Sequence, residues 1–130
     1  MSARLNSLGQ EIGCVLPTWN TCPEPAKKTM VGAYCRLEPL DATCHGEDLW
    51  QAYSADTQDR IWTYLPYGPF TTQAELKQWL TSHSETQDPL FYAIVNTSSG
   101  KAVGIATYLR IQPAAGVIEV GHINYSPALQ

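Results

Sequence analysis

The chain has 130 residues, 44% of them hydrophobic, and a net charge of −4 at pH 7. This length suits one domain with a substantial core, and the lack of a Lys/Arg-rich stripe argues against nucleic-acid binding. No apolar run approaches the roughly 18 residues of a membrane span, and residues 1–10 lack the apolar stretch of a secretory signal. We therefore expect a cytoplasmic protein that binds neither nucleic acid nor membrane.

The cysteines all fall in the first third of the chain, at Cys14, Cys22, Cys35 and Cys44. Their spacings match no zinc-binding pattern, so we assign no metal site. Without a secretory signal the compartment is expected to be reducing, which favours free thiols over disulfides. Cys35 falls in an expected strand, where it would act as a small core residue.

Glycines and prolines interrupt residues 1–30, which show no periodicity. We expect an extended N-terminal arm here, lying over a domain that occupies residues 31–130. Leu16 and Trp19 are the candidates to anchor the arm. For residues 1–10 a disordered tail is an equally good interpretation.

The domain is expected to begin with a strand over residues 31–40, where weak alternation ends at Pro39. A helix follows over about 43–56, because apolar residues recur there at helical spacing. Asp41 is the expected N-cap of this helix, and Thr43 is the alternative.

A second helix is expected after the aromatic-rich segment 60–70, in which two prolines and a glycine exclude regular structure from the second half. Either Thr71 or Thr72 is expected to cap it, since Glu75 stands at capping-box distance from Thr72. Four large aromatic residues are expected in the core: Trp50, Trp62, Phe70 and Trp79. His45 and His83 look like solvated residues near helix ends.

Three strands are expected in the last third of the chain, over 90–95, 102–111 and 117–125, joined by turns short enough for antiparallel hairpins. The element order predicts an α+β fold with an antiparallel meander. Gly104 inside the second of these strands suggests that a backbone, bulge or ligand approaches closely. In the last strand, a β-bulge near Gly121 would realign the apolar pattern.

Four stretches carry a likeness to a known family: residues 34–40 (YCRLEPL), 62–70 (WTYLPYGPF), 102–104 (AVG) and 117–127 (VIEVGHINYSP). Together they resemble the GCN5-related N-acetyltransferases (GNAT), in particular the group of ribosomal-protein alanine acetyltransferases. The resemblance implies the N-terminal half of an acyl-CoA N-acyltransferase fold, with the order strand-helix-helix-strand-strand-strand. It also implies transfer of an acetyl group from acetyl-CoA to a primary amine on a small molecule or peptide.

In the resembled family a glycine-rich loop and a helix follow the fourth strand and bind the pyrophosphate of CoA. Neither occurs in these 130 residues. We therefore expect a C-terminally truncated domain with an incomplete cofactor site and little or no activity alone.

Glu119 is the candidate catalytic residue, because a carboxylate can accept the proton of the attacking amine. Its alternative role is that of a structural carboxylate between strands. The resemblance places the peptide-like pantetheine arm along the backbone of the last strand, at Ile123, Asn124 and Tyr125. His122 is a candidate substrate contact, with a neutral imidazole base or a structural histidine as alternatives.

Tyr64 and Tyr67 are the candidates to wall the acceptor pocket, because aromatic rings attract a cationic amine. Packing in the core is the alternative role for both. A non-catalytic GNAT-like remnant is the alternative function: its open last strand would pair with a partner chain or a second copy of itself. A free-standing α+β ligand-binding domain would explain the composition but not the four matching stretches.

Overall fold

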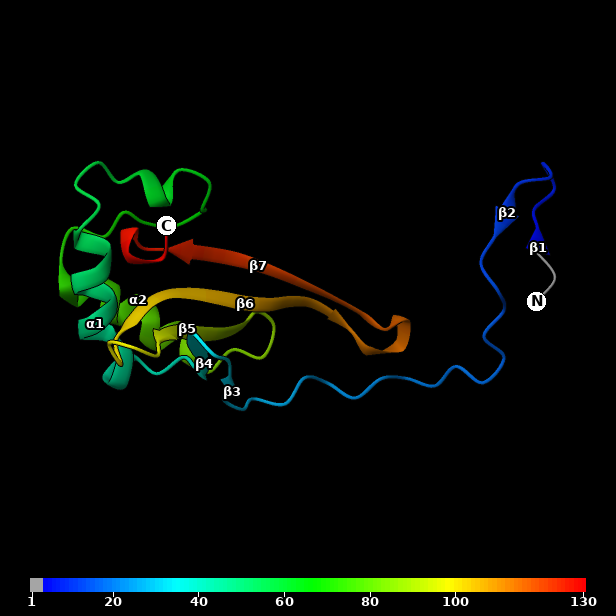
Figure 1. The fold of residues 1–130 in the computed structure, drawn as a ribbon, viewed down its shortest axis with the longest axis horizontal. Coiled ribbons are helices and arrows are strands. Elements are labelled where there is room, and N and C mark those ends of the chain that lie inside the picture. Colours follow the sequence, from blue (N-terminus) through cyan, green and yellow to red (C-terminus); the bar gives the residue numbers. More distant parts are fainter. Residues whose placement is uncertain (1–3) are drawn as a thin grey trace.

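The computed structural model describes residues 4–130, in which a five-stranded antiparallel sheet has the order β3-β4-β5-β6-β7. The strands of this sheet are β3 Met30–Val31, β4 Cys35–Pro39, β5 Leu90–Asn96, β6 Ala102–Gln112 and β7 Val117–Tyr125. Helices α1 (Ala42–Ser54) and α2 (Gln73–Ser84) lie between β4 and β5 in the chain and pack together beside the sheet (Figure 1). The α+β fold and the antiparallel meander of β5, β6 and β7 are confirmed.

The start of the domain differs from the expected single strand over residues 31–40. The backbone turns after β3, where the Gly32 N–H donates to the Cys35 carbonyl at 2.9 Å. Strand β4 then runs back antiparallel to β3. The turn brings the Cys35 oxygen to 3.0 Å from the place where a Cβ on Gly32 would lie, so only a residue without a side chain fits comfortably.

Helix α1 begins at the expected cap, since the Asp41 carboxylate accepts from the N–H groups of Thr43 and Cys44, both at 2.8 Å. The expectation for His45 was wrong, because its side chain is buried in the first turn of the helix. Its Nδ1 accepts from the Asp41 N–H at 3.0 Å, so the ring proton sits on Nε2, which lies 2.9 Å from a Glu38 oxygen. His45 therefore joins the helix start to β4.

Helix α2 is capped by Thr72, whose hydroxyl accepts from the Glu75 N–H at 3.2 Å. The Glu75 carboxylate reaches back to the N–H of Thr71 at 2.9 Å, one residue earlier than in a standard capping box. His83 lies in the last turn of α2, as expected, but it is only half-exposed. Its ring stacks on Trp79 with centroids 4.2 Å apart, which removes much of it from solvent.

The core lies between the two helices and β5 and β6. Its most completely buried aliphatic side chains are Leu49, Leu76, Leu80, Ala93, Ala102 and Ile105. Trp62 is 7% exposed and confirmed as a core residue, while Trp50, Phe70 and Trp79 are partly buried against the same cluster. Gly68 allows this packing, because a Cβ there would lie 2.4 Å from the Trp62 ring.

The N-terminal arm carries a small hairpin of β1 (Arg4–Leu5) and β2 (Glu11–Ile12), drawn away from the sheet in Figure 1. Trp19 anchors the arm, since its indole N–H donates to the Ala114 carbonyl at 2.8 Å, at the turn between β6 and β7. Leu16 is exposed and does not anchor it. Residues 1–3 of the expected arm lie outside the described part of the chain. All four cysteines are free thiols, and Cys35 is only half-buried.

Candidate functional site

Strand β7 contains an irregularity where one was expected. Thr107 faces Gly121 and Ile105 faces Asn124, so β7 advances three residues where β6 advances two. The extra residue is a β-bulge, and His122 within it has φ 45°, in the left-handed region. The bulge near Gly121 is therefore confirmed.

The bulge turns the His122 side chain toward the helices. Its ring stacks on that of Tyr67, with centroids 5.6 Å apart and an interplanar angle of 15°, and lies 5.7 Å from the Phe91 ring. Tyr67 in turn packs on Trp79 at 4.4 Å. Two of the expected site residues, Tyr67 and His122, are thus brought together by an aromatic cluster of the α1–α2 loop, α2 and β5.

The protonation of His122 follows from this setting. Burial lowers its pKa below the ordinary value of 6.5, nearby His83 lowers it further, and Glu119 opposes the shift. The imidazole is therefore neutral at pH 7.

A pH titration of stability is expected to show this depressed pKa. The unfolded chain binds a proton at His122 more readily than the folded chain does, so stability rises with pH in this region. The contribution of His122 is complete above pH 6.5 and is lost as the pH falls through the lower folded-state pKa. Denaturation by urea between pH 5 and 7.5 measures it (about the range where histidines titrate).

His122→Asn is the matched variant, because asparagine tolerates the left-handed backbone and does not titrate. We expect a shallower slope of stability against pH in the variant. An unchanged slope would assign the pH dependence to other groups.

The inner face of β7 carries polar atoms without partners among the described residues. Asn124 is 1% exposed and Ser126 is fully buried, yet neither the amide of the first nor the hydroxyl of the second makes a hydrogen bond. The hydroxyls of Tyr53 and Tyr67 and Nδ1 of His122 are buried and unpartnered as well. Buried polar atoms are nearly always hydrogen-bonded, so this set is suited to bind water or a polar ligand.

These groups are uncharged. Burial raises the pKa of Tyr53, and nearby Tyr67 raises it further; burial also raises the pKa of Tyr67. Both phenols therefore keep their protons and can donate as well as accept. The inner face of β7 thus offers neutral hydrogen bonds rather than a charge.

Within residues 4–130 β7 is the last strand of the sheet, so its outer edge is free of any other strand in this part of the chain. The Ser126 N–H donates to the Val103 carbonyl of β6 at 3.2 Å, so the neighbouring Tyr125 directs its backbone groups away from β6. The Tyr125 carbonyl accepts from Nε2 of Gln130 at 3.0 Å. By the same alternation Ile123 faces the free edge.

The backbone of Asn124 faces β6 instead. It pairs with Ile105, and its carbonyl lies 2.6 Å from the place where a Cβ on Gly104 would stand. Of the three residues expected along pantetheine, Ile123 and Tyr125 therefore present backbone to the edge, while Asn124 presents its side chain to the interior.

Glu119 lies beside the bulge. One of its carboxylate oxygens would be 3.5 Å from a Cβ on Gly121, and the other binds Nη1 of Arg110 at 3.0 Å. Arg110 belongs to a second bulge, on β6, whose two backbone N–H groups at Arg110 and Ile111 donate to the Asp88 carboxylate. Glu119 is thus held next to His122 by a residue of the neighbouring strand.

Tyr64 is 97% exposed, and the structure does not bring it to the cluster. Tyr53 and Ser126 were missed by the sequence analysis. Tyr53 follows the apolar spacing of α1, which gave no sign that its hydroxyl would lie unpartnered beside Tyr67. Ser126 precedes a proline and carries no motif of its own.

Within residues 4–130, no three His, Cys, Asp or Glu side chains are grouped so as to hold a metal ion. None of the helices in this part of the chain has the length and hydropathy needed to cross a membrane.

Solved structures resemble this chain. A GCN5-related N-acetyltransferase from Brucella melitensis matches 88% of the chain at 41% identity with a TM-score of 0.85. A probable GNAT-family acetyltransferase from Chromobacterium violaceum matches 93% of it at 32% identity with a TM-score of 0.78. The chain has the GNAT acyltransferase fold.

The same likeness supports membership of the GNAT family. The chain spans 52% of the first of these GNAT proteins and 60% of the second, so it corresponds to little more than half of each. No family model and no curated protein matches it. The narrower resemblance to the ribosomal-protein alanine acetyltransferases stays a prediction.

Proposed function

We propose that the protein transfers an acetyl group from acetyl-CoA to a primary amine. The observation that carries this proposal is the structure of β7. Its outer edge offers free backbone groups, and its bulge places unpartnered polar side chains on the inner face. An open edge suits the amides of pantetheine, and a polar inner face suits a reacting thioester and amine. The likeness to GNAT acetyltransferases supports the same function.

In this proposal the amine nitrogen attacks the thioester carbonyl directly. The new C–N bond forms, the C–S bond breaks and the thiolate of CoA leaves, with no acyl-enzyme between. Glu119 accepts the proton that the amine loses, and Arg110 holds its carboxylate in place. His122, neutral and stacked on Tyr67, contacts the acceptor.

The backbone of Ile123 and Tyr125 pairs with the pantetheine arm along the free edge. Tyr67 lines the acceptor side, where its ring attracts a cationic amine. Tyr64 belongs to the same loop and is exposed in this structure. In this proposal it joins the acceptor wall when a ligand is bound. The 130 residues hold no glycine-rich loop that opens a helix, the usual cradle of a pyrophosphate, so we propose that they transfer the acetyl group slowly by themselves.

Acetyl-pantetheine is the donor that tests this proposal, because it carries the arm without the nucleotide and its phosphates. We expect the chain to bind acetyl-pantetheine with a Kd of about 1 mM or below, which NMR titration detects. The affinity should be modest because only contacts along the strand edge hold the donor. Acetyl-CoA should bind with a similar Kd, because the phosphates find no glycine-rich loop.

Two substitutions at Tyr125 separate backbone from side chain. Tyr125→Pro removes an N–H that faces the free edge and leaves the bonds to β6 intact, so donor binding should be lost. Tyr125→Ala keeps that N–H and should bind the donor. Equal binding by the two variants, or no binding by the parent chain, would overturn the proposed edge.

The same free edge favours one alternative function, in which β7 pairs with a strand of another chain. This function predicts that Tyr125→Pro abolishes a self-association or partner complex while acetyl-pantetheine has no effect on the parent chain. Sedimentation of both proteins distinguishes it from acetyl transfer.

A further inference from the structure

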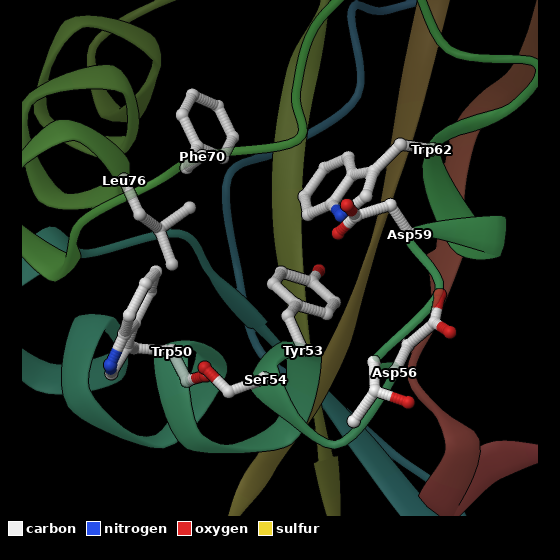
Figure 2. Close-up of a pocket in the computed structure, with 9 residues that line it drawn as sticks. Trp50, Tyr53, Ser54, Asp56, Asp59, Trp62, Phe70 and Leu76 are labelled. Carbon is white, nitrogen blue, oxygen red and sulfur yellow. The ribbon is translucent and has the colours of Figure 1, made fainter.

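A cavity of about 170 Å³ lies at the C-terminal end of α1 (Figure 2). The end of α1, the segment that follows it and the beginning of α2 line the cavity. Four aromatic residues and two carboxylates contribute to its wall: Trp50, Tyr53, Trp62, Phe70, Asp56 and Asp59. Neither Tyr67 nor any residue of β7 lines it, but the cavity adjoins the candidate acetyl-transfer site, because Tyr53 belongs to both and Trp62 packs edge-on against Tyr67 with ring centroids 6.3 Å apart.

The charge of the cavity is negative and unbalanced. No Lys, Arg or His side chain lines it. In the described residues neither Asp56 nor Asp59 forms an ion pair. Asp56 accepts from the backbone N–H groups of Gln58 and Ile61, at 3.3 and 2.9 Å, which fixes its carboxylate at the wall without neutralising it.

The end of α1 adds to this negative field. Helix α1 has no basic residue in its last turn, so the partial negative charge of its terminal carbonyl groups is uncompensated there. Tyr53 stands in this last turn and lines the cavity, while its hydroxyl is buried beside Tyr67 without a partner among the described residues.

Aromatic rings form part of the cavity wall, although the surface that the cavity exposes is mostly polar. Figure 2 shows Asp56 and Asp59 on one side, Trp50 and Phe70 on the other, and the Tyr53 ring between them. Aromatic faces within about 6 Å of a cation attract it through their quadrupoles, most strongly when the rings exclude water. An anion or an uncharged polar molecule gains nothing comparable from such walls.

We propose that this cavity binds a small organic cation, namely an alkylammonium group. The volume equals the share of liquid that about five or six water molecules occupy, so the cavity has room for a quaternary or primary ammonium head with a few carbons. The ammonium group belongs either to a free amine or to a lysine side chain of a peptide. The proposal does not depend on acetyl transfer, and failure of either leaves the other standing.

Titration of the 130-residue chain with choline tests the proposal, with the four tryptophan indole N–H signals observed by ¹H–¹⁵N NMR. We expect saturable shifts of the Trp50 and Trp62 signals at about millimolar choline, from cation–π contact. The Trp19 signal should not move, because its indole donates to Ala114 in the arm. A lysine amide in a parallel titration shows whether side-chain ammonium groups enter as well.

Two controls make the result decisive. The uncharged isostere 3,3-dimethylbutan-1-ol has the shape of choline and should bind at least tenfold more weakly, since it lacks the charge that the carboxylates and rings attract (about tenfold for one such charge). Asp59→Asn should weaken choline binding about fivefold, and asparagine accepts the left-handed backbone that Asp59 has at φ 56°.

Glu85→Gln removes one exposed carboxylate that does not line the cavity and should leave the Kd for choline unchanged. Equal binding of choline and its isostere would overturn the proposal. The same holds for an Asp59→Asn variant that binds choline as the parent does, or for the absence of a saturable shift at Trp50 and Trp62.

Discussion

Gly104→Ala is expected to lower the free energy of unfolding by about 2 kcal/mol, in the range found for overpacked interiors. A Cβ at this position would stand 2.6 Å from the backbone oxygen of Asn124 and 2.9 Å from Cδ1 of Leu129. The first of these atoms belongs to the β6–β7 ladder and cannot move aside without breaking it. Urea denaturation followed by circular dichroism measures the loss.

Gly46→Ala provides the matched control with the opposite sign. Gly46 lies inside α1, where an added Cβ would meet Leu80 at 3.7 Å, an ordinary contact. Alanine in a helix interior is more stable than glycine by about 0.5–1 kcal/mol, so this variant should gain stability. Similar effects of the two substitutions would show that β6 and β7 are not tightly joined at Gly104.

Glu119→Gln is expected to reduce the rate of acetyl transfer from acetyl-pantetheine by about 100-fold, the lower range for loss of a general base. Glutamine keeps the shape and the contact with Arg110 but cannot accept a proton. Donor affinity should not change, because the free edge of β7 is untouched. Release of the free thiol in the presence of a primary amine measures the rate.

Glu47→Gln, on the exposed side of α1, is the control and should transfer at the parent rate. If Glu119→Gln transfers acetyl groups at the parent rate and His122→Asn does not, the base is the imidazole of His122 and not the carboxylate of Glu119. Its depressed pKa already keeps that imidazole neutral at pH 7. A parent chain that binds acetyl-pantetheine yet never transfers its acetyl group would limit the proposed function to binding.

Local patterns accounted for most of the fold. Asp41 and Thr72 could be identified as caps because the signal lies within three or four residues of the helix start. The bulge near Gly121 could be predicted because it corrects an apolar alternation that the sequence displays. The turn after β3 was missed, since the residues on both sides of it have equally good strand character.

Contacts between distant segments could not be predicted in this way. His45 looked solvated because its partner Glu38 belongs to another element, and His83 because the ring that covers it lies one helical turn away. In the site, Tyr67 and His122 meet through a long loop and a strand, while Tyr64 of the same loop stays in solvent. Which of two neighbouring tyrosines turns inward depends on packing that a single sequence does not display.

The bulges on β6 and β7 have opposite effects on the register of this hairpin. Residues near Gly104 and Tyr125 and residues near Gln112 and Val117 share one register, and only the stretch between the bulges is offset by one position. Deleting the extra residue of one bulge would remove that irregularity and leave every other pair in place, whereas a deletion elsewhere in either strand would shift the pairing and move neighbouring side chains to the other face. The two bulges are therefore the positions where this hairpin can lose a residue, and the paired stretch around Glu119 between them is the part that cannot change length in one strand alone.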